Sequence, residues 1–206
     1  MRYVVYTLGL LLLTLGIACT IQARLGTSPF DALLVGLSHR VGLTVGSWEI
    51  IIALLLIGCN ALLQRQRPQM IGLLTACITG IGIDLWLFVL RSWLTPQIWY
   101  GQMTGFVIGM LVMGLGTAMY LHTHFAPMPI DKLTLILREL GKTNILVART
   151  IVYAVFLLLA WSLDGPIGIG TILTVCLGGV ILHWFMKRIE KLWGEPYRSQ
   201  PEQHTL

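Results

Sequence analysis

Pro29-Phe30-Asp31 and Pro129-Ile130-Asp131 place the same Pro-x-Asp element at two points of one chain, with a spacing of 129 − 29 = 100 residues. The glycines that precede the two elements match at the same spacing, namely Gly9 with Gly109 and Gly16 with Gly116. Matched glycines, prolines and acids without a gap indicate an internal duplication, because self-similarity at a fixed period is the signature of a repeat architecture. Glycines spaced in this way also allow helices to pack closely in a membrane.

The composition excludes a water-soluble globular protein. Of the 206 residues, 56% are hydrophobic and 11% are charged, and the mean hydropathy is +0.79, so too little polar surface is left to face water. The net charge of +5 does not indicate nucleic-acid binding, because the basic residues fall in short segments between apolar runs and near the C-terminus. The expected surroundings are therefore a lipid bilayer, and no nucleic-acid partner is expected.

Six apolar segments are long enough to cross a bilayer, which takes about 20 helical residues. They cover residues 3–22, 46–63, 70–90, 102–121, 144–163 and 167–186. Only helices and closed barrels satisfy their backbone hydrogen bonds in lipid, and these runs lack the alternation of barrel strands. The predicted fold is therefore an all-α membrane protein with six transmembrane helices.

Charges between the spans predict the orientation of the chain. Arg65 and Arg67 follow the second span, and further basic residues follow the sixth. The positive-inside rule places both segments, and hence both termini, on the cytoplasmic side of the membrane.

The duplicated unit holds three spans, which is an odd number. We therefore expect two three-helix repeats, 1–95 and 96–190, that are inverted relative to one another. Residues 191–206 are predicted to form a polar cytoplasmic tail that is disordered.

Each Pro-x-Asp element is predicted to begin a short helix after the first span of its repeat. Ser28 suits the N-cap, Pro29 suits the first turn, and Asp31 completes a capping box. The helices, 29–41 and 129–140, are too short to cross a bilayer at 1.5 Å per residue. Two interpretations remain open: an amphipathic helix at the membrane interface, or a re-entrant helix whose N-terminus faces a central cavity.

Three further ionisable residues lie within the predicted spans. Asp84 lies inside the third span, where a charged carboxylate costs about 3 kcal/mol and usually faces a cavity or a partner. Glu49 and Arg149 occupy equivalent positions of the two repeats, and each is either an anchor at a helix end or part of an inner polar network. Arg149 is the stronger functional candidate, because a guanidinium near the membrane interior invites an anionic partner.

The stretch Leu25-Gly26-Thr27-Ser28-Pro29-Phe30-Asp31-Ala32-Leu33 and the later Gly165-Pro166-Ile167-Gly168-Ile169-Gly170-Thr171 resemble the two repeats of the YczE/YitT-type bacterial integral membrane proteins. The chain departs from that pattern at two places. The second repeat often carries Gly-Pro-Arg-Asp, whereas Ala126-Pro127-Met128-Pro129-Ile130-Asp131 lacks both that glycine and that arginine, and Tyr153 stands where an acid often follows the repeat-two arginine. The resemblance implies a cytoplasmic-membrane protein and an architecture rather than a substrate.

No catalytic, cofactor or metal motif is present in the sequence. There is no HExxH motif, no CxxC pair and no serine–histidine–acid grouping, and His122 and His124 are spaced too closely to share one helical face. We therefore expect no enzyme, no cofactor and no metal site.

The function that these features favour is a transporter or permease for a small solute or ion, with its site where the two repeats meet. Asp31, Asp131, Asp84 and Arg149 are the candidate polar contributors, and Ser28, Thr75 and Thr171 are candidate hydrogen-bonding neighbours. The alternative is a non-transporting membrane regulator or scaffold that binds a partner protein through the helix 129–140. A second copy of the chain is an equally compatible partner.

Overall fold

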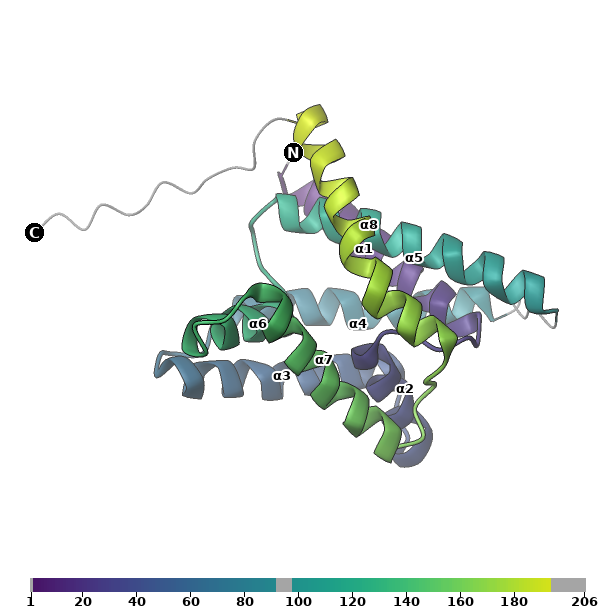
Figure 1. Ribbon diagram of the computed structural model, residues 1–206, viewed down its shortest axis with the longest axis horizontal. Coiled ribbons are helices and arrows are strands. Elements are labelled where there is room, and N and C mark those ends of the chain that lie inside the picture. Colours follow the sequence, from purple (N-terminus) through teal and green to yellow (C-terminus); the bar gives the residue numbers. More distant parts are fainter. Residues whose placement is uncertain (1, 92–97, 194–206) are drawn as a thin grey trace, which may run out of the picture.

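The computed structural model describes residues 2–91 and 98–193, and all regular structure in these residues is helical (Figure 1). The helices are α1 (Arg2–Gln22), α2 (Pro29–Val41), α3 (Val45–Gln64), α4 (Ile71–Leu90), α5 (Trp99–His122), α6 (Pro129–Leu140), α7 (Ile145–Ser162) and α8 (Ile169–Trp193). All except the short helices α2 and α6 are long and apolar enough to cross a membrane. The all-helical class and the six predicted spans are therefore confirmed.

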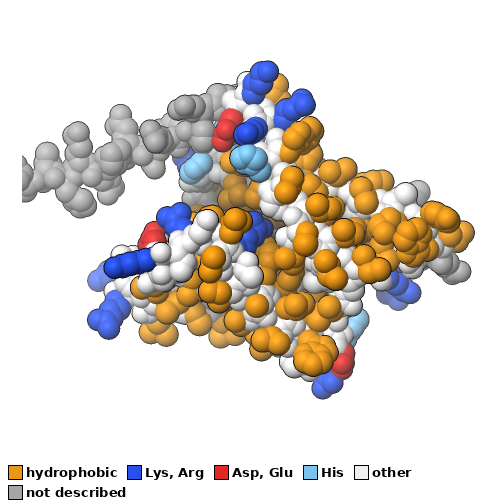
Figure 2. All heavy atoms as spheres, viewed as in Figure 1, with side chains coloured by type: hydrophobic (Ala, Val, Ile, Leu, Met, Phe, Trp, Pro, Cys, Tyr) orange, Lys and Arg blue, Asp and Glu red, His pale blue; other side chains and the backbone are white. Residues whose placement is uncertain are grey.

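The surface of the bundle matches a lipid environment. Large apolar side chains such as Phe88, Leu158 and Trp161 are 78%, 63% and 74% exposed. Figure 2 shows hydrophobic side chains over the lengths of the helices and charged side chains gathered toward helix ends. An apolar coat of this extent would be unfavourable in water, so the exposed faces fit hydrocarbon.

The last helix is longer than the hydropathy pattern predicted. We expected the sixth span to end at 186, but α8 continues to Trp193 and includes Lys187 and Lys191. Hydropathy measures the length that sits in lipid, whereas a helix can continue past the bilayer into a polar segment. The tail was predicted to begin at residue 191, but residues 191–193 belong to α8. The rest of the predicted tail, 194–206, lies outside the described residues.

α1 and α5 run antiparallel and form the most extensive helix–helix contact among the described residues. A Cβ atom on Gly9 would lie 3.0 Å from the Gly116 carbonyl oxygen, and one on Gly16 would lie 2.6 Å from that of Gly109. Gly9 corresponds to Gly109 and Gly16 corresponds to Gly116 at the repeat spacing of 100 residues, so each contact becomes the other when the two halves are interchanged. The backbones therefore touch directly, as small residues permit between helices in membranes.

Each short helix packs against a helix of the other half of the chain. α2 packs on α7, and α6 packs on α3, while α1 packs on α4 and α5 packs on α8. At the α2–α7 contact, the rings of Phe30 and Phe156 meet edge to face with their centroids 5.2 Å apart. Each of these four pairings thus has a counterpart in the other half, and the short helices hold the two halves together.

One helix pairing breaks this correspondence. α3 packs closely on α4, where a Cβ atom on Gly46 would lie 2.0 Å from the Gly80 carbonyl oxygen. In the described residues, α7 makes no comparable contact with α8. Figure 1 shows α8 crossing the bundle at a steep angle to α3 and α4. The second half is therefore open at the place where the first half is closed.

The glycine contacts predict a selective effect on stability. Gly116→Ala places a Cβ atom 2.3 Å from the Leu13 amide nitrogen, so we expect it to lower the free energy of unfolding by about 1–3 kcal/mol, as overpacking typically does. Gly105→Ala lies on the same helix with no neighbour within 4 Å of its Cβ atom and is the matched control. Thermal unfolding in detergent measures both; equal melting temperatures for the two variants would contradict the contact.

Candidate functional site

Asp31 is held at the start of α2 by a local cap. The Ser28 hydroxyl accepts a hydrogen bond from the Asp31 backbone N–H (3.2 Å) and donates one to the Asp31 carboxylate (2.6 Å). Pro29 occupies the first turn, where its missing N–H costs nothing. Burial raises the pKa of the Asp31 carboxyl, and the Ser28 hydroxyl works against that rise.

Asp131 has the equivalent position in α6 but a different partner. Met128 stands at the N-cap and supplies no side-chain cap, and the Asp131 carboxylate instead accepts a hydrogen bond from the Tyr120 hydroxyl of α5. Burial raises the pKa of the Asp131 carboxyl, and Tyr120 and Arg149 oppose that rise. Helix capping therefore accounts for the position of Asp31 but not for that of Asp131.

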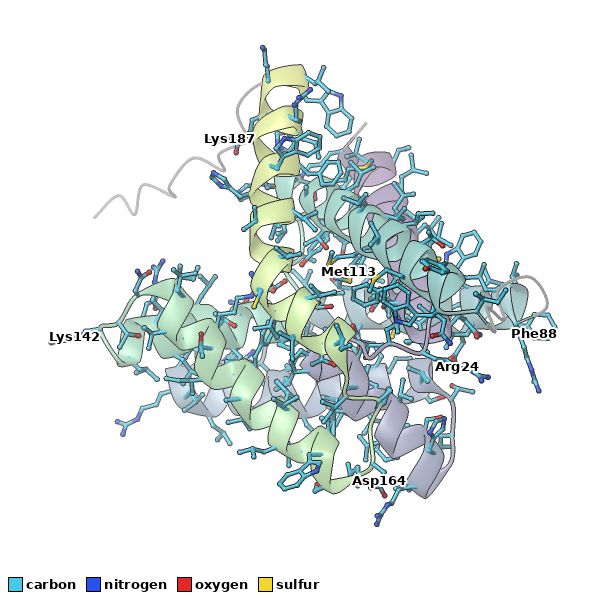
Figure 3. The ribbon with its side chains drawn as sticks, turned by 45° about the vertical axis from the view of Figure 1, so that its right-hand side comes forward. Arg24, Phe88, Met113, Lys142, Asp164 and Lys187 are labelled. Carbon is cyan, nitrogen blue, oxygen red and sulfur yellow. The ribbon has the colours of Figure 1, made fainter. Side chains whose placement is uncertain are left out.

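Both aspartates line one cavity between the two halves. Its volume is about 120 Å³, and it is walled by residues of α1, α2, α3, α5, α6, α7 and α8. Met113 of α5, which also lines it, lies near the centre of the molecule in Figure 3, whereas Lys142 and Asp164 lie at the periphery. The polar and aromatic polar lining consists of Ser28, Asp31, Glu49, Thr117, Tyr120, Asp131, Arg149, Tyr153 and Thr174.

The room for this cavity comes from glycines of the second half. In the first half, the Thr14 side chain fills the space beside Gly82, where a Cβ atom would lie 2.7 Å from the Thr14 hydroxyl oxygen. The positions that correspond to these two, at 14 + 100 = 114 and 82 + 96 = 178, are Gly114 and Gly178, and both line the cavity. A Cβ atom on Gly178 would have no neighbour within 4 Å, so side-chain volume is missing there.

Glu49 forms an acidic end of the cavity together with Asp31. Its carboxyl group is buried, with 4% of the residue exposed, and it accepts a hydrogen bond of 3.3 Å from the Thr79 hydroxyl. Asp31 lies within electrostatic range of it. Of the two interpretations of Glu49, the structure therefore places it in an inner polar network rather than at an exposed helix end.

Arg149 faces the same cavity from α7. Its guanidinium donates a hydrogen bond of 2.8 Å to the Tyr153 hydroxyl and lies 5.1 Å from the centre of that ring. Tyr153 thus occupies the partner position in which an acid was expected from the family pattern. Among the described residues the ion pair present is Arg40–Asp164 at the surface, and Arg149 forms none.

A second space adjoins the cavity. It has a volume of about 240 Å³ and shares Ile130, Asp131, Arg149, Tyr153 and Leu182 with the cavity. It lies between α6 and α7 on one side and α5 and α8 on the other. Figure 2 shows the surface hollowed between α8 and the α6–α7 segment.

The remaining predicted site residues lie elsewhere. The Asp84 carboxylate accepts hydrogen bonds from the Gly46 N–H (2.8 Å) and the Thr44 hydroxyl, at the start of α3. Thr75 is buried between the Tyr6 hydroxyl (2.6 Å) and the Ala126 carbonyl oxygen (3.2 Å). Thr171 accepts from the Gly168 N–H (3.2 Å) at the start of α8. The structure therefore brings together Ser28, Asp31, Asp131 and Arg149 but not Asp84, Thr75 or Thr171.

The first turns of α2 are not at the periphery of the bundle. The first eight residues of α2, from Pro29 to Gly36, are all buried, and exposure begins toward its C-terminal end. Two backbone hydrogen bonds hold the connector before α2 against the α7–α8 loop and the start of α8. The Thr27 N–H donates to the Pro166 carbonyl oxygen (3.2 Å), and the Gly170 N–H donates to the Leu25 carbonyl oxygen (2.7 Å). This arrangement favours the re-entrant interpretation for α2, with its N-terminus facing the cavity.

Comparison with known proteins identifies a family and several relatives of the chain. Residues 1–187 match a family of unknown function, DUF6198. The uncharacterized protein YyaS of Bacillus subtilis is 58% identical over 93% of this chain and 95% of its own length, and the uncharacterized membrane protein YczE of the same organism is 35% identical over 89% and 85%. An uncharacterized protein of Haemophilus influenzae is 27% identical over 93% and 86%. No solved structure matches the chain.

The hydrogen bonds of Asp84 predict a structural effect. Asp84→Ala removes the acceptor for the Gly46 N–H at the start of α3, so we expect a loss of about 1 kcal/mol in the free energy of unfolding, as for a helix cap. Asp164→Ala removes an acid from an exposed ion pair and should change stability less. Thermal unfolding in detergent compares the two, and a neutral Asp84→Ala would show that this carboxylate does not stabilise the α3 start.

Proposed function

The chain belongs to this DUF6198 family, and we propose that it is a carrier that moves a small solute or ion across the bacterial cytoplasmic membrane. The observation that supports the proposal is a polar cavity lined by three acids and an arginine, between two halves of an otherwise apolar bundle. The chain has no enzymatic role in this proposal.

The energetic cost of placing ionisable groups within the membrane supports a ligand-binding role for the cavity. Ionisable groups at membrane depth are expensive, and they usually face a cavity, a partner or a transport path. Packing alone would be served better by apolar side chains, because buried ionic groups seldom add net stability. Asp31, Glu49, Asp131 and Arg149 all face one space, so their shared cost is explained if that space binds a polar solute.

The packing of the two halves supports an inverted repeat. Gly9 meets Gly116 and Gly16 meets Gly109, so that equivalent positions exchange contacts between antiparallel helices. An exchange of this kind follows from a two-fold axis perpendicular to both helices. Such an axis would lie in the membrane plane, as in carriers whose substrate binds where inverted repeats meet.

The difference between the two halves suggests how access alternates. In the first half, Gly46 and Gly80 bring α3 and α4 into backbone contact beside Asp84. The corresponding positions 46 + 100 = 146, 80 + 96 = 176 and 84 + 96 = 180 hold residues that are exposed rather than packed together, namely Leu146, Cys176 and Val180. One pathway to the cavity is closed and the other is open, which is the arrangement of a carrier in one of its two states.

We assign the open pathway to the cytoplasmic side. It is lined by Leu121 at the end of α5 and Ile145 at the start of α7, which flank the segment 123–144. Arg2 donates hydrogen bonds to the Thr123 carbonyl (2.8 Å) and the His124 carbonyl (3.0 Å), so the N-terminus lies on the same side. The basic loop residues support a cytoplasmic location for this side.

The proposal predicts that filling the cavity stops transport. Gly178→Leu projects a side chain into the cavity from a position with open space around it, so the protein should fold and its transport should fall at least tenfold. Gly179→Leu is the matched control, because the next residue of α8 is exposed, has open space around it and does not line the cavity. Proteoliposomes containing each variant are incubated with a bacterial metabolite extract, and their washed contents are measured by mass spectrometry.

The expected result is at least one metabolite that enters wild-type and Gly179→Leu vesicles but not Gly178→Leu or protein-free vesicles. If no metabolite enters wild-type vesicles above the protein-free level, the carrier assignment is wrong. Equal entry into Gly178→Leu vesicles would show that the cavity is not the path.

A further inference from the structure

We propose that the cavity binds a small zwitterion, with its ammonium group against Asp31 and Glu49 and its anionic group against Arg149. The inference deepens the proposed carrier function and rests on it for the meaning of the cavity. It follows from where the charges lie within that space, from their partners and from the volume available.

The acidic end lacks a cation. Asp31 and Glu49 are each only 4% exposed and lie within electrostatic range of one another. Their side-chain hydrogen-bond partners are the neutral hydroxyls of Ser28 and Thr79. In the described residues neither acid forms an ion pair with a basic side chain. A ligand ammonium group, with three N–H donors, supplies both the missing charge and the missing donors.

The basic end lacks an anion. Arg149 has five N–H donors, and the structure gives one of them to the neutral Tyr153 hydroxyl. Asp131 lies within electrostatic range of Arg149 but is bonded to Tyr120 and forms no ion pair with it in the described chain. A planar carboxylate can take two parallel N–H bonds from a guanidinium. The remaining donors of Arg149 are therefore suited to the anionic group of a ligand.

The two ends belong to one space, and Tyr153 lies near both of them. Tyr153 lines the cavity and is within electrostatic range of both Asp31 and Asp131. A single molecule that spans from Glu49 to Arg149 would therefore pass its ring. The cavity and its side space, about 120 and 240 Å³, compare with the roughly 150 Å³ that holds one benzene molecule in an engineered protein cavity. The ligand is accordingly small.

Ligands with one charge fit the lining less well. A simple cation leaves the Arg149 donors unmatched, whereas a simple anion must enter a space that also holds three acids. Among the described residues, no group of three or more histidine, cysteine or acidic side chains is placed to hold a metal ion. A molecule with both charges at opposite ends matches both ends of the cavity.

The test compares a zwitterion with its two halves. Purified protein in detergent is heated with glycine, β-alanine, 4-aminobutyrate or 6-aminohexanoate, and with the amine and the carboxylate of the same carbon number, such as n-butylamine and butyrate. A ligand that binds the folded state raises the melting temperature with concentration. We expect at least one amino acid of the series to bind at least tenfold more tightly than its matched amine and its matched carboxylate.

Three variants assign the ends of the ligand. Glu49→Gln and Arg149→Gln should each raise the Kd of the bound amino acid at least tenfold. Arg149→Lys, which keeps the charge if the glutamine variant fails to fold, should retain the preference for the zwitterion over the amine. Asp164→Asn, an exposed acid at the molecular surface, is the control and should leave the Kd unchanged.

The inference is wrong if no member of the series binds, or if an amine or a carboxylate alone binds as tightly as the matched amino acid. Its failure is separable from that of the carrier assignment. Entry of a solute with a single charge into wild-type proteoliposomes would preserve the carrier and exclude the zwitterion. Binding of an amino acid without entry of any solute would preserve the zwitterion site and exclude the carrier.

Discussion

The backbone contact between α1 and α5 is the constraint on which the rest of the structure depends. Four glycines, two in each helix, let these helices approach until carbonyl oxygens of one lie at van der Waals distance from the other. In lipid there is no hydrophobic driving force between helices, so close packing of small residues supplies much of the association. Because α4 packs on α1 and α8 packs on α5, this contact fixes where the other helices can stand. The cavity lies beside it, walled by Leu13 and Ile17 of α1 and by Met110 and Met113 of α5.

Much of the fold was predictable because the bilayer restricts the solutions. Length and hydropathy located the six spans to within a few residues at most ends, and proline located the starts of α2 and α6 at Pro29 and Pro129. The end of α8 was missed because hydropathy does not report where a helix stops once it leaves the lipid. The burial of the first turns of α2 was also beyond the sequence, since Ser28 and Pro29 begin a helix equally well at an interface or inside a protein.

The site was predictable only in part, because residue types do not reveal which neighbours they meet in the folded chain. The repeated Pro-x-Asp element pointed to Asp31 and Asp131, and the repeat spacing that pairs position 49 with position 149 pointed to Arg149. All three residues line the cavity. Asp84 was an equally good candidate by its depth in a span, yet its carboxylate bonds to the start of α3. Tyr120 carried no signal, because a tyrosine in an apolar run is usually an ordinary packing residue. Tyr153 was noted only because it stands where the family pattern often has an acid. Glu49 was recognised from the sequence as the repeat equivalent of Arg149 but was not among the candidate site residues, although it lines the cavity.

The duplication predicted from the sequence gives a meaning to the differences between the two halves. A gene duplication begins with identical copies, so positions that differ between equivalent sites are where the halves have separate tasks. Thr14 fills the space beside Gly82 in one half, whereas the equivalent Gly114 and Gly178 line the cavity in the other, and a Cβ atom on Gly178 would have no neighbour within 4 Å. Glu49 and Arg149 carry opposite charges at equivalent positions and face the same cavity. If a two-fold axis relates the helices, identical residues would give a cavity with like charges at both ends. Opposite charges instead give it a direction, so a bound molecule with two unlike ends has one preferred orientation.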